Sequence, residues 1–318
     1  MSHVTLVSDK TCEKLLTAAD ALDCMRSLFS QMAAGDADNF PVVRERPGIA
    51  NSVYGVKSGV NRADDLLGLK IGGYWPGNTE LGMARHQSTV VLTNPRTGEP
   101  VALVGGNVIT ALRTAASAAL SIDVLARSDA KVLGVIGAGG QALWHAKAAL
   151  AVRRFDRVLV WNRTPEAAAQ LAAAIGNGAE VATSSNGLVK ASDVVVTITG
   201  ATTPLFDVSA VKPGTHFACM GADTAGKGET PAELLAMASL FADSIVQART
   251  LGECQRAPDH ESGLTTLGDV ILGQAPGRVS DQDITLFDGT GLGLQDLAMA
   301  QLAMRKAIDA KLIQTFEI

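Results

Sequence analysis

The residues best suited to bind a ligand form a glycine-rich segment near the middle of the chain. Positions 137–142 read Gly-Ala-Gly-Gly-Gln-Ala, which matches G-x-G-x-x-A. The segment follows an apolar run expected to be a strand and opens a stretch expected to be a helix, the setting that this pattern requires. Free amides at a helix start hold phosphates well. We therefore expect a dinucleotide to contact Gly137, Ala138, Gly139, Gly140 and Gln141; a structural turn is the alternative.

The end of the second expected strand indicates which dinucleotide is preferred. An acid at this point would bind the ribose hydroxyls of NAD, but the chain has Trp161-Asn162-Arg163-Thr164. No carboxylate repels a 2′-phosphate, and Arg163 can pair with one. Asn162 and Thr164 can add hydrogen bonds. The pattern favours NADP(H), with NAD(H) possible, although Arg163 can also be a surface residue where Thr164-Pro165 starts a helix.

Several cations stand among small or apolar residues. Lys70 ends an apolar run in GLKIGG, and Arg113 lies in TALRTAASAAL. A guanidinium in such a helix usually meets an anion. Arg44 lies in PVVRERP, together with Arg46. Cations that converge on one pocket would suit a substrate carboxylate, whereas each taken alone can be structural or solvated.

Two further residues could move or stabilise a proton. Asp223, in ACMGADTAGKGE, follows an expected strand, and doubly wound sheets bind ligands at the carboxyl ends of strands. It could act as a proton donor, as a base or as the partner of a developing iminium, or it could cap a loop. Lys227, in the same loop, could contact a cofactor phosphate. His86, in ARHQSTVVL, could donate a proton, but a hydrogen-bonded structural role is favoured.

The order of expected elements predicts an α/β fold. A helix is expected over 13–34, followed by short β runs at 67–71, 89–93 and 101–104, with a hairpin turn at 94–98. Wholly apolar strands then alternate with helices, which indicates a Rossmann-type, doubly wound parallel sheet. Strands are expected at 131–137, 157–162, 193–199, 215–220, 239–243 and 284–287, and helices at 110–127, 140–154, 165–175 and 294–311. We expect an α+β domain of residues 1–126 with 293–318, and a Rossmann domain of residues 127–292.

Composition excludes several classes of function. The 318 residues are 47% apolar and carry a net charge of −5, so a disordered chain and a general attraction to nucleic acid or anionic membrane are not expected. No C-x-x-C pair occurs, and His3, His145, His216 and His260 show no mutual spacing that suggests a metal site. Neither a signal peptide nor an apolar stretch of about 18 residues is evident, which favours a cytoplasmic protein without a membrane span.

The chain resembles the ornithine cyclodeaminase/μ-crystallin family over nearly its whole length. The resemblance rests on GLKIGG, TGEPVALVGGNVITALRTAASAALS, VIGAGGQA, WNRT, GADTAGKGE and GTGLGLQDLAMA. It implies that the α+β domain binds substrate and forms a homodimer. It further implies that the substrate carboxylate is bound by Lys70 and Arg113, with Arg44 as a third cation. Asp223 would be the catalytic carboxylate, with Lys70 also catalytic. Thr114, Lys227 and Thr290, the last often serine in the family, would lie near the cofactor.

Two features favour one activity within that family. WNRT resembles the NADP(H)-using members, and Asn51–Lys57 lacks the glutamate that ornithine cyclodeaminases carry. RHQSTVVL, with His86, also resembles bacterial 1-pyrroline-2-carboxylate reductases. The resemblance thus implies an NAD(P)H-dependent reductase of a small cyclic imino acid, making L-proline, with 1-piperideine-2-carboxylate to L-pipecolate as a second reaction. Ornithine or lysine cyclodeaminase, alanine dehydrogenase, and an NADPH-binding protein without turnover are the alternatives.

Overall fold

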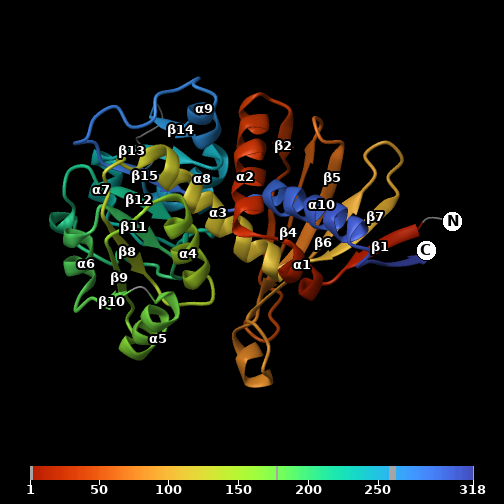
Figure 1. Cartoon of the computed structure of the whole chain (residues 1–318), viewed down its shortest axis with the longest axis horizontal. Helices are drawn as coiled ribbons and strands as arrows, with labels where there is room; N and C mark the ends of the chain where they lie inside the picture. Colours follow the sequence, from red (N-terminus) through yellow and green to blue (C-terminus); the bar gives the residue numbers. More distant parts are fainter. Residues whose placement is uncertain (1–2, 177, 258–262, 318) are drawn as a thin grey trace. The chain divides into compact units, whose positions relative to one another are not determined.

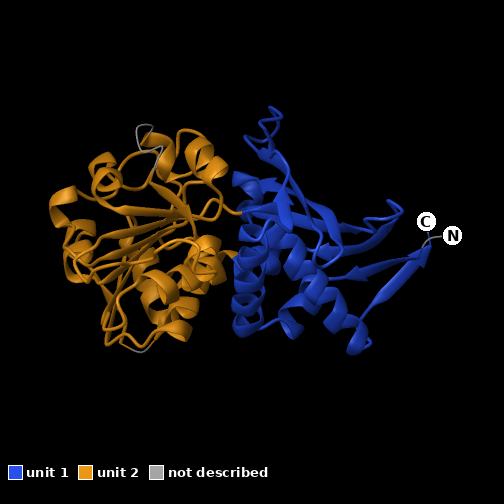
Figure 2. Cartoon of the chain, turned by 90° about the horizontal axis from the view of Figure 1, so that it is seen from above, with its two compact units in different colours: residues 1–113, 292–318 blue, residues 114–291 orange. Residues whose placement is uncertain are grey.

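The chain forms two compact units. The computed structural model describes residues 3–176, 178–257 and 263–317, so His260 lies outside the described residues. Unit 1 comprises Met1–Arg113 and Leu292–Ile318, and unit 2 comprises Thr114–Gly291 (Figure 2). The chain first passes from unit 1 to unit 2 within one helix, α3 (Asn107–Leu125), rather than in a loop. The expected boundary at residue 126 instead follows the end of this helix.

Unit 1 is built on a sheet of eight strands. These are β1 (His3–Val7), β2 (Ala37–Asn39), β3 (Val43–Glu45), β4 (Val53–Asn61), β5 (Leu66–Tyr74), β6 (His86–Thr93), β7 (Pro100–Gly105) and β16 (Gln314–Glu317). Their order is β16-β1-β7-β6-β5-β4-β2, with β3 also paired to β4. Only β1 and β7 run parallel; the other pairs are antiparallel. The expected turn at 94–98 joins β6 to β7.

Helices cover one face of this sheet. They are α1 (Asp9–Leu15), α2 (Ala18–Ala33) and α10 (Gly293–Asp309), with the short 3-10 helix η1 (Pro76–Leu81) elsewhere in the unit. Figure 1 shows α10 lying along β4, β5 and β6, against which it packs. The single helix expected over 13–34 is wrong. The Thr17 hydroxyl accepts a hydrogen bond from the Asp20 backbone amide, and the Asp20 carboxylate accepts one from the Thr17 backbone amide. This capping box starts a second helix after Thr17.

Unit 2 is a parallel sheet with helices between its strands, as the sequence predicts. Its strands are β8 (Val132–Ile136), β9 (Arg157–Trp161), β10 (Glu180–Val181), β11 (Val194–Thr197), β12 (His216–Cys219), β13 (Ser239–Ala242), β14 (Leu264–Thr266) and β15 (Thr285–Asp288). Their order is β10-β9-β8-β11-β12-β15-β13-β14, and every neighbouring pair is parallel. The direction of winding reverses between β8 and β11, the place where such sheets bind ligands.

The helices of unit 2 connect these strands. They are α4 (Ala142–Val152), α5 (Pro165–Ile175), α6 (Ser185–Ala191), α7 (Ala232–Met237), α8 (Ile245–Leu251) and α9 (Leu267–Ile271), with 3-10 turns η2 (Val208–Ala210) and η3 (Glu253–Arg256). The core is apolar around Phe217, Leu188 and Leu286, and Phe206 stacks on Phe217. Four cysteines are free, and three of them are buried.

Helix α3 corrects one expectation about membranes. Among the described residues it is the one helix long and apolar enough to cross a bilayer by length and composition. Its only charged residues are Arg113 and Asp123, too few to lower the hydropathy much. Since 83% of that window is buried in the structure, α3 has the character of a core helix.

Candidate functional site

Two of the predicted cations in unit 1 meet one buried carboxylate. The Lys70 ammonium on β5 lies 3.0 Å from Oδ1 of Asp296 on α10, and Nε of Arg113 lies 3.2 Å from the same oxygen. Lys70 also donates to the Thr110 hydroxyl at 2.9 Å, and Arg113 donates to Oε1 of Gln295 at 2.9 Å. The three charged side chains are at most 7% exposed. One carboxylate thus holds two cations, and the cluster keeps a net positive charge.

The charges of this cluster stabilise one another. Burial disfavours an ionised Asp296, but the charges of Arg113 and Lys70 outweigh burial and lower its pKa below the ordinary value. Glycine lets α10 approach the sheet closely, since a Cβ at Gly59 would lie 2.9 Å from the Leu294 side chain and one at Gly68 would lie 3.2 Å from that of Leu297. Larger residues here would separate Asp296 from Lys70.

Strand register places further cations on the face of the sheet that α10 covers. Directly opposite residues of antiparallel strands point to the same face. Lys57 on β4 lies opposite Lys70, and Arg44 on β3 lies opposite Gly55, which in turn lies opposite Gly72. Arg44, Lys57 and Lys70 therefore share one face, on which strands β3 to β6 contribute no carboxylate. Like charges in opposite positions repel, so this arrangement favours an anionic ligand.

His86 begins β6 on the same face. It lies opposite Tyr74, four residues along from Lys70. Burial, followed by the charge of Lys70, lowers the pKa of His86 to about 4. At neutral pH its imidazole is therefore uncharged, which makes it a hydrogen-bonding group beside the cations rather than an acid.

The glycine loop of unit 2 has the geometry that a dinucleotide requires. Gly137 has φ 113°, and a Cβ there would lie 2.5 Å from the Ile198 carbonyl oxygen. Gly139 and Gly140 have no neighbouring atom within 4 Å of a built Cβ, so the space beside them is open. The side chain of Gln141 does not cap α4, which leaves the helix start to a ligand. These residues fit a pyrophosphate.

The segment after β9 is partly ordered by its own contacts. The Asn162 amide donates to the Thr164 carbonyl at 3.1 Å. The Arg163 side chain is exposed at the start of α5, where Pro165 is the first helical residue. No carboxylate lies in this segment, so a 2′-phosphate would meet no repulsion from it.

The loop after β12 brings Asp223 and Lys227 together. Their charged groups lie 2.7 Å apart, and the Thr224 hydroxyl donates to the same Asp223 oxygen at 3.1 Å. Both charged side chains are about one-third exposed, at 34% and 30%. This pairing places a cation beside Asp223 and leaves its carboxylate accessible to a ligand. Asp223 belongs to unit 2 and Lys70, also expected to be catalytic, belongs to unit 1.

The last two predicted cofactor residues are buried in unit 2. The Thr290 hydroxyl donates to Asp243 at 2.8 Å and accepts from the Gln247 amide at 2.9 Å. Thr290 is thus part of an internal network that fixes its backbone. Thr114, one residue beyond Arg113 on α3, is 8% exposed.

Sequence reasoning missed Asp296, Lys57 and Thr110. Asp296 stands in the apolar stretch LGLQDLAMA, where, like Arg113, it is a charged residue among small or apolar neighbours. Lys57 could have been found from the alternation of residues in β4, once β4 and β5 are recognised as a hairpin. Thr110 carries no signal, because a threonine one turn before Arg113 has many possible roles.

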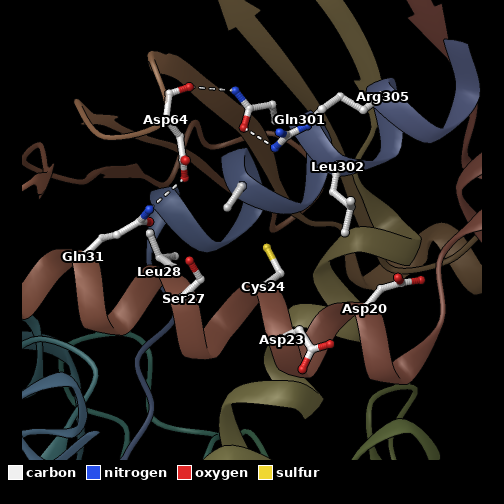
Figure 3. Close-up of a pocket in the computed structure, with 11 residues that line it drawn as sticks. Asp20, Asp23, Cys24, Ser27, Leu28, Gln31, Asp64, Gln301, Leu302 and Arg305 are labelled. Carbon is white, nitrogen blue, oxygen red and sulfur yellow. Dashed lines mark hydrogen bonds between the residues drawn. The ribbon is translucent and has the colours of Figure 1, made fainter. Parts of the chain in front are cut away.

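A separate cavity of about 280 Å³ lies between α2 and α10 (Figure 3). Asp20, Asp23, Asp64 and Arg305 are among its lining residues, and none of the sequence-predicted site residues lines it. The Asp64 carboxylate accepts one hydrogen bond from the Gln31 amide, and the Gln301 amide donates to the Asp64 backbone carbonyl. Among the described residues, no group of three metal-ligating side chains occurs here or elsewhere.

Comparison with known proteins identifies close relatives over the whole chain. The model of the ornithine cyclodeaminase/mu-crystallin family matches residues 2–311. The iminosuccinate reductase of Paracoccus denitrificans is 44% identical over 98% of this chain and 99% of its own. Its structure with NAD+ superposes with a TM-score of 0.94 over the full length of both chains, at 43% identity.

Two other solved structures share the fold. An archaeal alanine dehydrogenase dimer with bound NAD has a TM-score of 0.92 at 28% identity, covering all of both chains. The Δ1-pyrroline-2-carboxylate reductase of Thermococcus litoralis, in complex with NADH and L-proline, has a TM-score of 0.91 at 26% identity. It covers 99% of this chain and 100% of that one.

Proposed function

The chain belongs to the ornithine cyclodeaminase/mu-crystallin family, and from this premise we propose that it is an NAD(P)H-dependent reductase of 2-imino acids. We further propose that its preferred substrate carries two carboxylates, as iminosuccinate does, and that the product is aspartate. The observation that carries this choice is the excess of cations on one sheet face of unit 1. Arg44, Lys57 and Lys70 share this face, and Arg113 joins Lys70 at the carboxylate of Asp296. The 44% identity to an iminosuccinate reductase supports it.

In this proposal the residues of unit 1 bind and orient the substrate. Lys70 and Arg113 bind the carboxylate next to the imine carbon, while Asp296 holds both cations in place. Lys57 and Arg44 bind the second carboxylate, and neutral His86 offers a hydrogen bond. Charge-assisted hydrogen bonds of this kind contribute about 1.5–3 kcal/mol each.

The residues of unit 2 hold the cofactor and favour the reactive form of the substrate. The loop Gly137–Gln141 fits the pyrophosphate, and a bound dihydronicotinamide supplies the hydride that reduces the imine carbon. Asp223 stabilises the protonated imine, because its negative charge attracts the positive charge of the iminium. The nitrogen already carries its proton, so hydride addition yields the neutral amine, which takes a further proton from water.

We also propose that NADPH is preferred, on the strength of Arg163 and the absence of an acid after β9. The relatives described above bind NAD+ or NADH, so NADH is expected to be used as well. Replacing Arg163 with alanine should lower the ratio of kcat/KM for NADPH to that for NADH by about tenfold or more. An unchanged ratio would contradict the preference.

We expect the reaction in the cytoplasm.

A cyclic imine with one carboxylate, Δ1-pyrroline-2-carboxylate, is the second candidate substrate. The likeness to the Thermococcus litoralis reductase supports it. Lys70 and Arg113 suffice for its single carboxylate, which would leave Lys57 and Arg44 without a substrate anion. We therefore expect it to be reduced less efficiently than iminosuccinate.

Steady-state kinetics with matched variants test the choice of substrate. Iminosuccinate would be formed from oxaloacetate and ammonium, Δ1-pyrroline-2-carboxylate would be compared, and ornithine would be tested for ammonia release. Lys57→Met should lower kcat/KM for iminosuccinate by about tenfold or more and that for the cyclic imine much less. Lys10→Met, at an exposed site on α1, is the control. Equal losses for both imines would contradict the two-carboxylate proposal, and ammonia release from ornithine would indicate a cyclodeaminase.

We propose that the active form is a homodimer. The sheet face opposite α10 carries apolar side chains, among them Leu6, Tyr54 and Ile71, each 36–38% exposed. The side chains of these described residues point away from the helices of unit 1, as their register requires. An apolar sheet face of this kind suits a second copy of the chain. The dimeric structure of the archaeal alanine dehydrogenase supports this proposal.

A further inference from the structure

Glu229 is a buried carboxylate that the proposed reaction does not use. It follows the Asp223 loop and is 0% exposed. Its Oε1 accepts from the amide and the hydroxyl of Thr199, each at 2.7 Å. Its Oε2 accepts from the Thr197 hydroxyl at 2.7 Å and the Gly221 amide at 2.9 Å. One side chain therefore receives four hydrogen bonds from two different strand ends.

These four bonds connect the two loops that carry the proposed chemistry. Gly221 starts the loop that holds Asp223 and Lys227, and Lys227 donates back to the Gly221 carbonyl at 3.3 Å. Thr199 adjoins the dinucleotide loop, because a Cβ at Gly137 would lie 2.9 Å from its methyl group. Gly221 itself must be glycine, since a Cβ there would lie 2.5 Å from the Glu229 carboxyl carbon. Glu229 thus fixes both loops to one point.

The surroundings of Glu229 make its hydrogen bonds necessary. Burial, and then the charge of Glu253, raise the pKa of Glu229 to about 7. Glu253 accepts the Glu229 backbone amide and pairs with Arg256, the nearby cation. Buried Asp288 and Cys219 also face this carboxyl cluster. An apolar side chain of similar volume would pack here at a lower desolvation cost. The role of the carboxylate is therefore to accept hydrogen bonds from the surrounding donors.

We propose that Glu229 is a positioning residue that sets the Asp223–Lys227 loop relative to the dinucleotide loop. It touches neither ligand and acts through Gly221 on one side and Thr199 on the other. This inference rests on the proposed function for its effect on kcat, but not for its effect on dinucleotide binding. It predicts that one internal substitution weakens dinucleotide affinity and slows imine reduction together.

Glu229→Gln tests this with the shape of the side chain conserved. The amide can accept on one side only, so its NH2 group would face two donors on the other, either Thr199 or the pair of Thr197 and Gly221. The dissociation constant for NADH, measured by the fluorescence of the bound cofactor, should rise about tenfold, and kcat for iminosuccinate should fall by a similar factor. Should this variant fail to fold, Thr197→Val removes one buried partner and should raise the dissociation constant about threefold.

Asp193→Asn is the matched control. Asp193 lies at the opposite end of β8, where it accepts the amides of Lys131 and Val132 and pairs with Lys212. Asp193→Asn weakens a comparable set of hydrogen bonds, but Asp193 contacts neither loop. The NADH affinity and kcat of this variant should therefore stay within twofold of wild type. Glu229→Gln with wild-type values, or an equal loss in Asp193→Asn, would overturn the proposal. If the wild type does not reduce the imine, the proposed function fails, while NADH binding still decides the role of Glu229.

Discussion

Asp296 is the residue on which the cation cluster of unit 1 depends. It holds Lys70 and Arg113 in fixed positions and offsets one of their two charges. Removing one partner of a buried ion pair leaves an uncompensated charge, which costs about 3–5 kcal/mol. We therefore predict that Asp296→Asn lowers the free energy of unfolding by about 3 kcal/mol, measured by urea titration. It should also lower kcat/KM for the imine by more than tenfold.

Asp38→Asn provides the comparison for that loss. Asp38 forms an ion pair with Arg62 at 2.7 Å, but both side chains are more than half exposed. Exposed pairs contribute about 0–1 kcal/mol, so this variant should unfold almost like the wild type. If Asp296→Asn were as stable as Asp38→Asn, the buried cluster would not have the role assigned to it.

His216 gives a pH dependence of stability whose sign is fixed. Its ring nitrogens contact the hydroxyls of Ser121 and Thr285, and burial, followed by the charge of Arg278, lowers its pKa to about 3. Between pH 6.5 and 3 the unfolded chain binds a proton at this histidine that the folded chain does not bind. The contribution of uncharged His216 to the free energy of unfolding is therefore complete above pH 6.5 and is lost as the pH falls toward 3.

The test of His216 is a difference between two proteins. Between pH 6 and 5, the free energy of unfolding of the wild type should fall by about 1.4 kcal/mol per pH unit more than that of His216→Gln. The comparison with wild type is needed because Glu229, whose pKa is raised to about 7, has the opposite effect: between pH 7 and 4.5 it makes the fold more stable as the pH falls. Parallel pH profiles for the two proteins would show that His216 titrates normally in the fold.

At the scale of elements, the glycine loop after β8 separates fold from ligand binding. Gly139 has open space around it, whereas Gly137 has a positive φ and a carbonyl close by. Gly139→Ala should therefore keep the melting temperature of wild type while weakening NADH binding by about tenfold, because the added methyl group meets only the ligand. Gly137→Ala should lower both.

The outcomes that would contradict this assignment are distinct. If Gly139→Ala bound NADH like the wild type, the pyrophosphate would lie elsewhere. If it melted at a much lower temperature, the space beside Gly139 would be occupied by the protein itself. Calorimetry and cofactor fluorescence on the same samples separate these cases.

Local patterns predicted the longer strands and helices of unit 2, but they missed its short helices α6 to α9 and its short strands β10 and β14. They predicted the elements of unit 1 less completely. Apolar runs such as 157–162 are strands in the structure, because a parallel sheet buries both faces of its strands. Helix α3 begins at Asn107, three residues before the expected start, because the Asp9 carboxylate caps Asn107 and Val108 from far away in the sequence. Strands β1 and β16 gain their place only by pairing with each other and with β7.

The same distinction applies to the candidate site. Lys70 and Arg113 stand out in the sequence because their neighbours are apolar, and the structure brings them to one carboxylate. The contribution of Lys57 depends on strand register, and that of Asp296 depends on how a helix from the far end of the chain packs on the sheet. Neither is a local property, so neither could be assigned from spacing alone.

At the scale of the whole molecule, the proposed homodimer is the feature most open to direct test. Leu6→Lys combined with Ile71→Lys places two charges on the exposed apolar sheet face. The mass in solution, measured by light scattering, should fall from that of a dimer to that of a monomer. Val246→Lys, at a site in unit 2 that is 73% exposed, should leave the mass unchanged. A dimer that survives the double substitution would contradict this interface.

Isotope transfer from the dinucleotide tests most directly whether the protein reduces an imine. The protein would be given NADH carrying deuterium at the transferable position, together with oxaloacetate and ammonium, and the products would be identified by mass spectrometry and NMR. We predict aspartate with one deuterium at C2 for each dinucleotide oxidised. Deuterated malate without labelled aspartate, which would mean that the carbonyl rather than the imine is reduced, would contradict it.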